Sequence, residues 1–149
     1  MRAIAAGYAR AGWRLRTGGS PGADAAFAQA ALEAGGAVEL YLPWPGFGSA
    51  GEGRAAAAVV RVRPSPGARA LAARVHPGWA CLAERERALL ARDGHQVLGA
   101  ALDRPARFVL CWTADGSLDG AGLFDDRTGQ TLRVAHRAGV PVFNLGRRP

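Results

Sequence analysis

The sequence contains no lysine: all 19 of its basic side chains are arginine. Against 12 acidic residues this gives a net charge of +7 over 149 residues, which favours polyanions, nucleotides or nucleic acid as partners. The complete preference for arginine, beside abundant alanine and glycine, is equally typical of a GC-rich genome. Because the arginines are also scattered along the chain, charge by itself does not establish DNA binding.

Cysteine is scarce, and long apolar runs are missing. Cys81 and Cys111 lie far apart among apolar residues, without C-x-x-C spacing, so we expect two reduced, buried thiols rather than a disulfide or a metal site. No two histidines have metal-ligand spacing; we interpret His95 as a hydrogen-bonded residue, and His76 and His136 as surface residues. No run approaches the roughly 20 apolar residues that cross a bilayer, and the first residues lack the regions of a signal peptide. We therefore expect a cytoplasmic protein without metal or cofactor.

Length and an apolar content of 49% predict one globular domain over residues 1–149. Strand-like and helix-like segments alternate along it. Strands are expected at 13–17, 38–42, 107–112 and 140–145, and helices at 1–11, 24–34, 68–75, 82–92 and 128–138. The stretch 55–62 fits either a helical turn or a strand. This alternation is typical of an α/β fold with a mostly parallel sheet, which binds ligands outside the carboxyl ends of its strands.

The most informative stretch, Thr17-Gly18-Gly19-Ser20-Pro21-Gly22, joins the first strand to the second helix. Its paired glycines allow a sharp turn close to a ligand. We expect Ser20 to cap the helix, Pro21 to take its first position, and Asp24 to suit the dipole of the first turn. Such a helix start is a natural seat for phosphate. The alternative is a purely structural turn, because the stretch is neither a Walker A loop nor a complete G-x-G-x-x-G motif.

Other loops are expected at the same rim of the sheet. The segment 43–48 contains Trp44 and Phe47 between prolines and glycines, Trp112 follows the strand 107–112, and Thr128-Gly129-Gln130 opens the last helix. Aromatic rings at such places can stack a nucleobase. We interpret Trp44 as a ligand contact and Trp112 as a core residue.

Several motifs, in this order, resemble the SLOG superfamily. They are 15–24, 39–44, and 128–131 followed by 139–145, and together they span nearly the whole chain. The superfamily joins the DNA-processing protein DprA, the Lonely guy (LOG) cytokinin-activating enzymes and related nucleotide-binding proteins, and the likeness is closest to small phage and prophage members described as DprA-like. The resemblance implies a Rossmann-like, three-layer α/β/α fold that holds a nucleotide or a nucleic-acid phosphate at its glycine motifs.

The resemblance also implies which residues form the site. The first motif would contain Gly18, Gly19, Gly22 and Asp24, and the second Thr128, Gly129 and Gln130; Thr17 and Trp44 complete the predicted ligand-binding set. Two departures weaken this site. The family's opening strand, which ends in Gly-Ser-Arg, is absent before the helix 1–11. Asp125-Asp126-Arg127 also stands where the family's second motif has glycines.

Three functions follow, in order of preference. The first is binding of a nucleotide or nucleotide-derived ligand without strong catalysis. The second is DprA-like binding of single-stranded nucleic acid, with Arg16, Arg61, Arg63 and the terminal arginines on phosphates. The third is a LOG-like nucleoside monophosphate hydrolase, which needs a carboxylate two residues after the second-motif Gly-Thr. Gln130 is a neutral amide that cannot take a proton, so no catalytic residue is assigned. A homo-oligomer is left open.

The absent first strand carries a structural prediction. In a Rossmann-like sheet that strand separates the strands 13–17 and 107–112. An open gap would leave buried backbone groups unpaired at about 1–3 kcal/mol each. We therefore expect these two strands to pair directly in parallel, or the centre of the sheet to be poorly formed.

Overall fold

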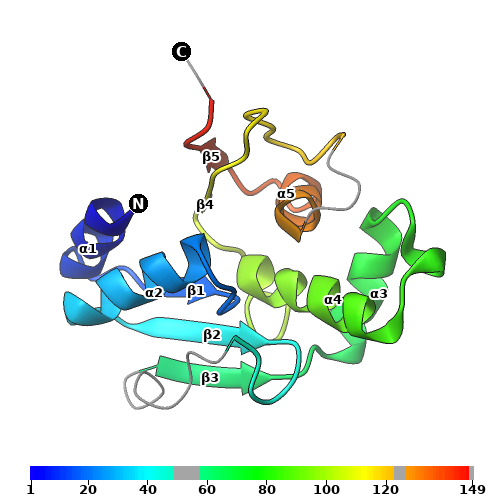
Figure 1. Cartoon of the computed structure of the whole chain (residues 1–149), viewed down its shortest axis with the longest axis horizontal. Coiled ribbons are helices and arrows are strands. Elements are labelled where there is room, and N and C mark those ends of the chain that lie inside the picture. Colours follow the sequence, from blue (N-terminus) through cyan, green and yellow to red (C-terminus); the bar gives the residue numbers. More distant parts are fainter. Residues whose placement is uncertain (49–57, 123–126, 148–149) are drawn as a thin grey trace. The chain divides into compact units, whose positions relative to one another are not determined.

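The computed structural model describes residues 1–48, 58–122 and 127–147 (Figure 1). Within these ranges the chain is a mixed α/β protein with five α-helices and short, parallel strands, which confirms the predicted class. The chain divides into two compact units, Met1–Arg63 (unit 1) and Pro64–Pro149 (unit 2). No helix in the described ranges is long and apolar enough to cross a membrane.

Unit 1 is a three-stranded parallel sheet with two helices on one face. Strand β2 is central, and its Val38 lies opposite Leu15 of β1 and Ala58 of β3. Small residues let the helices approach closely: Ala9, Ala28 and Ala31 pack on Val38. The elements are α1 (Arg2–Arg10), β1 (Leu15–Thr17), α2 (Ala23–Glu33), β2 (Val38–Leu42) and β3 (Ala58–Val62). The ambiguous stretch 55–62 is thus a strand from Ala58 on, and its first three residues lie outside the described ranges.

Unit 2 packs three helices and a two-stranded parallel sheet around Val97, Val134, Ala135 and Val140. Its first helix starts where the sequence provides a cap: the Ser65 side chain accepts a hydrogen bond from the Ala68 N–H at 3.2 Å. The elements are α3 (Pro66–Val75), the 3-10 turn η2 (Trp79–Cys81), α4 (Glu84–Leu98), β4 (Val109–Cys111), α5 (Arg127–Arg137) and β5 (Val142–Asn144).

Helix α4 is longer than the sequence suggested. It continues past 92 through Gly94 to Leu98. Glycine is a poor helix former, but tertiary packing overrides propensity at this position. A Cβ on Gly94 would touch Leu71 of α3 at 3.4 Å, so the glycine lets the two helices lie close together.

Strand β4 differs from its prediction in burial and pairing. The expectation that 107–112 is buried on both faces is wrong, because the residues of β4 are half-buried and Trp112 is 52% exposed. Trp112 is therefore no core residue. The described strands form two separate sheets, in which β1 pairs with β2 and β4 with β5. Direct pairing of 13–17 with 107–112, one of the two expected alternatives, is wrong.

Three side chains also correct the predictions of burial. Neither Cys81 nor Cys111 forms a disulfide, but Cys81 is exposed and Cys111 only half-buried, so the expectation of two buried thiols is wrong. His76 is not a surface residue: it is buried after α3, and its Nδ1 accepts a hydrogen bond from the Gly78 N–H at 3.1 Å. Each of these three residues lies at a turn or at the end of a strand. At such places the apolar character of the neighbouring sequence does not predict whether a side chain is exposed.

Candidate functional site

The glycine turn, Gly18–Gly22, connects the buried end of β1 to α2 in unit 1. The predicted cap is wrong: α2 begins at Ala23, with Gly22 at φ 92° as its N-cap, and Pro21 lies outside the helix. The Ser20 N–H instead donates to the Asp24 carboxylate, whose oxygen lies 3.2 Å away. A carboxylate of the chain itself therefore stands at the helix start, where an external anion would bind.

The β2 loop, Pro43–Gly48, reaches back to the glycine turn. Trp44 and Phe47 are half-buried and stack edge-on, with ring centroids 5.1 Å apart. A Cβ on Gly48 would overlap the carbonyl oxygen of Gly19, so only glycine allows this approach. The structure thus brings Trp44 and the first glycine motif to the same end of the parallel sheet.

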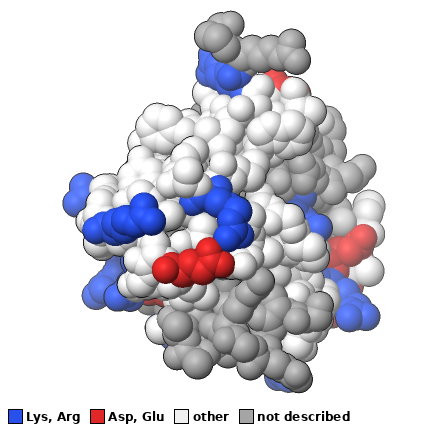
Figure 2. Space-filling model, turned by 60° about the vertical axis from the view of Figure 1, so that its left-hand side comes forward, with Lys and Arg blue, Asp and Glu red and all other residues white. Residues whose placement is uncertain are grey.

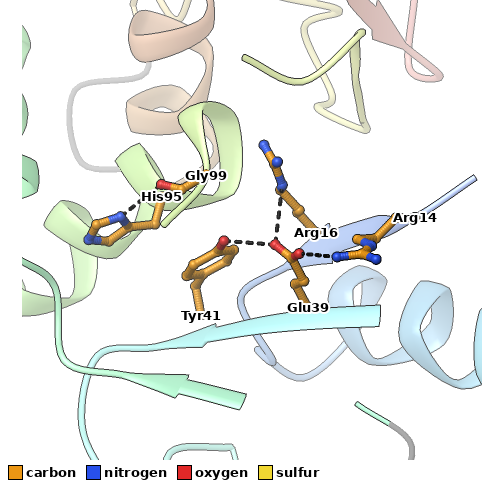
Figure 3. A network of polar contacts seen from close by, with 6 residues as sticks. All are labelled: Arg14, Arg16, Glu39, Tyr41, His95 and Gly99. Atoms are coloured by element: carbon orange, nitrogen blue, oxygen red, sulfur yellow. Dashed lines mark hydrogen bonds and ion pairs between the residues drawn. The ribbon is translucent and has the colours of Figure 1, made fainter. Parts of the chain in front are cut away.

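Sequence analysis missed a polar network around the buried side chains of Glu39 and Tyr41 on β2 (Figure 3). Glu39 and Tyr41 point to the same face of β2, and the Glu39 carboxylate accepts hydrogen bonds from the Arg14 guanidinium and the Tyr41 hydroxyl, each at 2.8 Å. Arg16, its neighbour on β1, forms an ion pair with Glu39 at 3.3 Å. We call these four residues the Glu39 network. One signal was available: a glutamate inside the apolar strand 38–42.

The network fixes the protonation of its own members. Burial raises the pKa of Glu39, but hydrogen bonds from Arg14 and Tyr41 and the charge of Arg16 outweigh it, so the pKa is lowered. Burial and the hydrogen bond to Glu39 together raise the pKa of Tyr41 to about 12. Near neutral pH the pair is therefore a carboxylate and a neutral phenol, which suits positioning rather than proton transfer.

The predicted nucleic-acid contacts of unit 1 lie on the two edge strands, β1 and β3, and directly after β3. The Arg16 guanidinium is held by Glu39, whereas Arg61, opposite Tyr41 on β3, and Arg63 are exposed. Arg63 has a left-handed backbone, with φ 71°, and its N–H donates to the Leu42 carbonyl at 2.9 Å. In Figure 2 the blue side chains of the described residues lie in separate small groups.

The second glycine motif belongs to unit 2 and lies inside its packing. Thr128, Gly129 and Gln130 form the first turn of α5, and Gln130 is 0% exposed. The Gln130 amide donates to the Ala72 carbonyl at 3.4 Å and accepts from the Arg133 guanidinium at 3.2 Å. Gln130 is therefore an interior residue of unit 2, and both of these hydrogen bonds lie within that unit. Asp125 and Asp126, which replace the family's glycines, lie outside the described residues.

His95 is the other predicted polar residue of unit 2. It lies within α4 and is buried. Its Nε2 accepts from the Ser65 N–H at 3.0 Å, so its Nδ1 carries the proton and donates to the Gly99 carbonyl at 3.1 Å (Figure 3). The interpretation of His95 as a hydrogen-bonded residue is confirmed, and it ties the start of α3 to the end of α4.

No family model, curated protein or solved structure matches this chain. In the described ranges, no three His, Cys, Asp or Glu side chains gather as metal ligands. The likeness to the SLOG superfamily therefore rests on the sequence motifs alone.

Proposed function

We propose that unit 1 binds a nucleotide or nucleotide-derived ligand, with its phosphate at the glycine turn and without strong catalysis. One observation carries the proposal. The glycine turn and the β2 loop meet at the carboxyl end of a parallel sheet, which is the edge where α/β proteins bind ligands. The first turn of α2 supplies backbone N–H groups and a positive dipole end, and the Trp44–Phe47 pair offers rings to a base.

The same proposal includes the finer architecture. The order of helices and strands, their parallel register and the motifs of the glycine turn support a Rossmann-like, three-layer fold of the SLOG type. The Glu39 network would then hold β1 and β2 in register directly below the ligand, since Arg16 lies one residue before Thr17.

Asp24 gives the proposal its sharpest test. The Asp24 carboxylate accepts a hydrogen bond from the Ser20 N–H at the start of α2. A phosphate that binds there is therefore repelled by a negative charge. Asp24→Asn keeps the size and removes the charge. Because a charge at a helix terminus contributes about 0.3–1 kcal/mol, this variant should bind phosphate-bearing ligands about two- to fivefold more tightly.

The first experiment is a thermal-shift screen of the full chain with mononucleotides, cyclic nucleotides and ADP-ribose, followed by titration calorimetry of the best ligand. Gly18→Val should abolish binding, because Gly18 lies buried in the turn. Gly7→Val is the matched control, since Gly7 in α1 has no atom within 4 Å of an added Cβ. Unchanged affinity in Gly18→Val would place the ligand elsewhere.

A second candidate, DprA-like binding of single-stranded nucleic acid, is favoured by the exposed Arg61 and Arg63. The Glu39 carboxylate already occupies Arg16, so few cations would contact phosphate, and affinity should be weak and vanish near physiological salt. Specific sub-micromolar binding at that salt would place this candidate first. The contacts of Gln130 inside unit 2 lend no support to a LOG-like hydrolase.

A further inference from the structure

The two-stranded sheet of unit 2 has one packed face and one exposed face. Val109 and Val142 pack on the core of unit 2. Side chains alternate along a strand, so their neighbours point the other way. These neighbours are Leu110 of β4 and Phe143 of β5. Phe108 and Trp112 flank β4 and Leu145 follows β5, and we call these five residues the aromatic face.

Three residues of the aromatic face, Trp112, Phe143 and Leu145, are exposed, and Phe108 and Leu110 are half-buried. Phe143 lies opposite Leu110 in the ladder and edge-on to Phe108, with centroids 5.6 Å apart. Phe143 is 58% exposed and Trp112 52%. Scattered apolar side chains are normal at a surface, but a contiguous patch is typical of an interaction site. A two-stranded sheet also gains little stability by itself, so covering this face would stabilise it.

The two ends of the aromatic face differ in charge. Arg104 and Arg107 precede β4, whereas Asp115 and Asp119 follow it. A hydrogen bond with the Thr113 side chain lowers the pKa of Asp115, and one from the Ala121 backbone lowers that of Asp119, so both stay ionised. The difference is reduced, but not reversed, by Asp103, by Arg147 and by Arg133, whose guanidinium donates to the Gly120 carbonyl beside Asp119.

We propose that the aromatic face is a self-association surface on which a second copy of this chain packs its own aromatic face about a two-fold axis, with the two β4 strands antiparallel. In this orientation the acidic end of one sheet lies over the basic end of the other. The parallel orientation would bring like charges together. A closed dimer uses the same patch on both copies, and buried aromatic anchors near its centre, such as Phe143, carry most of the affinity in interfaces of this kind.

The size of the face sets the expected strength. An aromatic side chain buries about 150–250 Å² when fully covered, so the exposed parts of the aromatic face amount to on the order of 400 Å² per copy. Standard interfaces bury about 800 Å² per partner. We therefore expect a reversible dimer with a dissociation constant in the micromolar range.

Sedimentation velocity of the full chain, from low micromolar to several hundred micromolar concentration, tests this. Wild-type protein should show a monomer–dimer equilibrium, and Phe143→Asp should weaken it at least tenfold while circular dichroism stays unchanged, because Phe143 is mostly exposed. Val59→Asp is the matched control, since Val59 is an exposed apolar strand residue of unit 1. A wild type that stays monomeric throughout, or a dimer that survives Phe143→Asp, would overturn the proposal.

Charge reversal tests the orientation. Arg107→Asp and Asp119→Arg should each weaken the dimer, and the double variant should regain affinity; additive losses would rule out the antiparallel arrangement.

Binding of an oligothymidylate to monomeric protein, lost in Phe143→Asp, would assign the aromatic face to nucleic acid instead. The aromatic face belongs to unit 2 and the proposed nucleotide site to unit 1, so Phe143→Asp should leave nucleotide thermal shifts unchanged. Failure of either proposal is thus distinguishable from failure of the other.

Discussion

Replacing Glu39 by glutamine should destabilise unit 1 although the two side chains have nearly the same shape. The Glu39 side chain is 10% exposed, accepts hydrogen bonds from Arg14 and Tyr41, and forms an ion pair with Arg16. Glutamine offers one oxygen and turns an NH2 group toward these donors. At least one guanidinium N–H group would then face an NH2 group that cannot accept from it, and the remaining partners would lose the negative charge of the carboxylate.

The size of the stability loss in Glu39→Gln follows from how exposed each partner of Glu39 is. The Arg14 side chain is 59% exposed, so its ion pair contributes about 0–1 kcal/mol. The Tyr41 bond is buried, and hydrogen bonds to a charged group contribute about 1.5–3 kcal/mol. With Arg16 between these cases, we expect Glu39→Gln to cost about 2–3 kcal/mol near neutral pH.

Lowering the pH should reduce the difference in unfolding free energy between the wild type and Glu39→Gln. The pKa of Glu39 is lowered in the folded state, so its ionised form stabilises the fold fully above the ordinary pKa of a glutamate. This stabilisation is lost as the pH falls through the lowered pKa of the folded state. Below that pH Glu39 is protonated and resembles glutamine, and the two unfolding curves should converge.

Urea unfolding followed by circular dichroism and tryptophan fluorescence measures the effect. Glu33→Gln is the matched control, because the ion pair of Glu33 with Arg2 is exposed on both sides and should contribute less than about 1 kcal/mol. Equal midpoints for wild type and Glu39→Gln at neutral pH would show that the network contributes no stability. A gap that stays constant on acidification would refute the assigned role of the charge.

Three further outcomes are expected. Arg63→Gly should raise the free energy of unfolding by about 0.5–1 kcal/mol, since Arg63 has φ 71° and glycine relieves left-handed strain; a lower urea midpoint would contradict this. His95→Leu should cost about 1–3 kcal/mol, because the Ser65 N–H loses its acceptor, which a chemical-unfolding curve would detect. Adenosine monophosphate should release no free base in a chromatographic assay. Release that is lost in Gln130→Ala, in a variant still folded, would establish a hydrolase.

Local pattern determined much of the fold. The strand 38–42 was predicted at both ends, because β-branched and aromatic residues lie between a double glycine and Pro43. The helices α1, α2 and α5 were predicted to within a residue or two. The type and ends of these elements depend on short stretches of sequence. The spacing of apolar residues sets the type, and nearby glycine and proline residues set the ends.

Competing hydrogen bonds and tertiary packing decided where α2 begins, which polar side chains meet and which strand residues are exposed. Ser20 was a plausible cap, but its own N–H is taken by Asp24 and the helix starts at Ala23. Glu39 meets Arg16 only because β1 and β2 pair in one register, so the glutamate inside the strand 38–42 signals a polar partner without identifying it as Arg16. Exposure of Trp112 likewise depends on which face of β4 the helices of unit 2 cover. Sequence determined which segments are helix or strand; the tertiary structure decided which donors and faces those segments share, because such contacts join residues far apart in the chain.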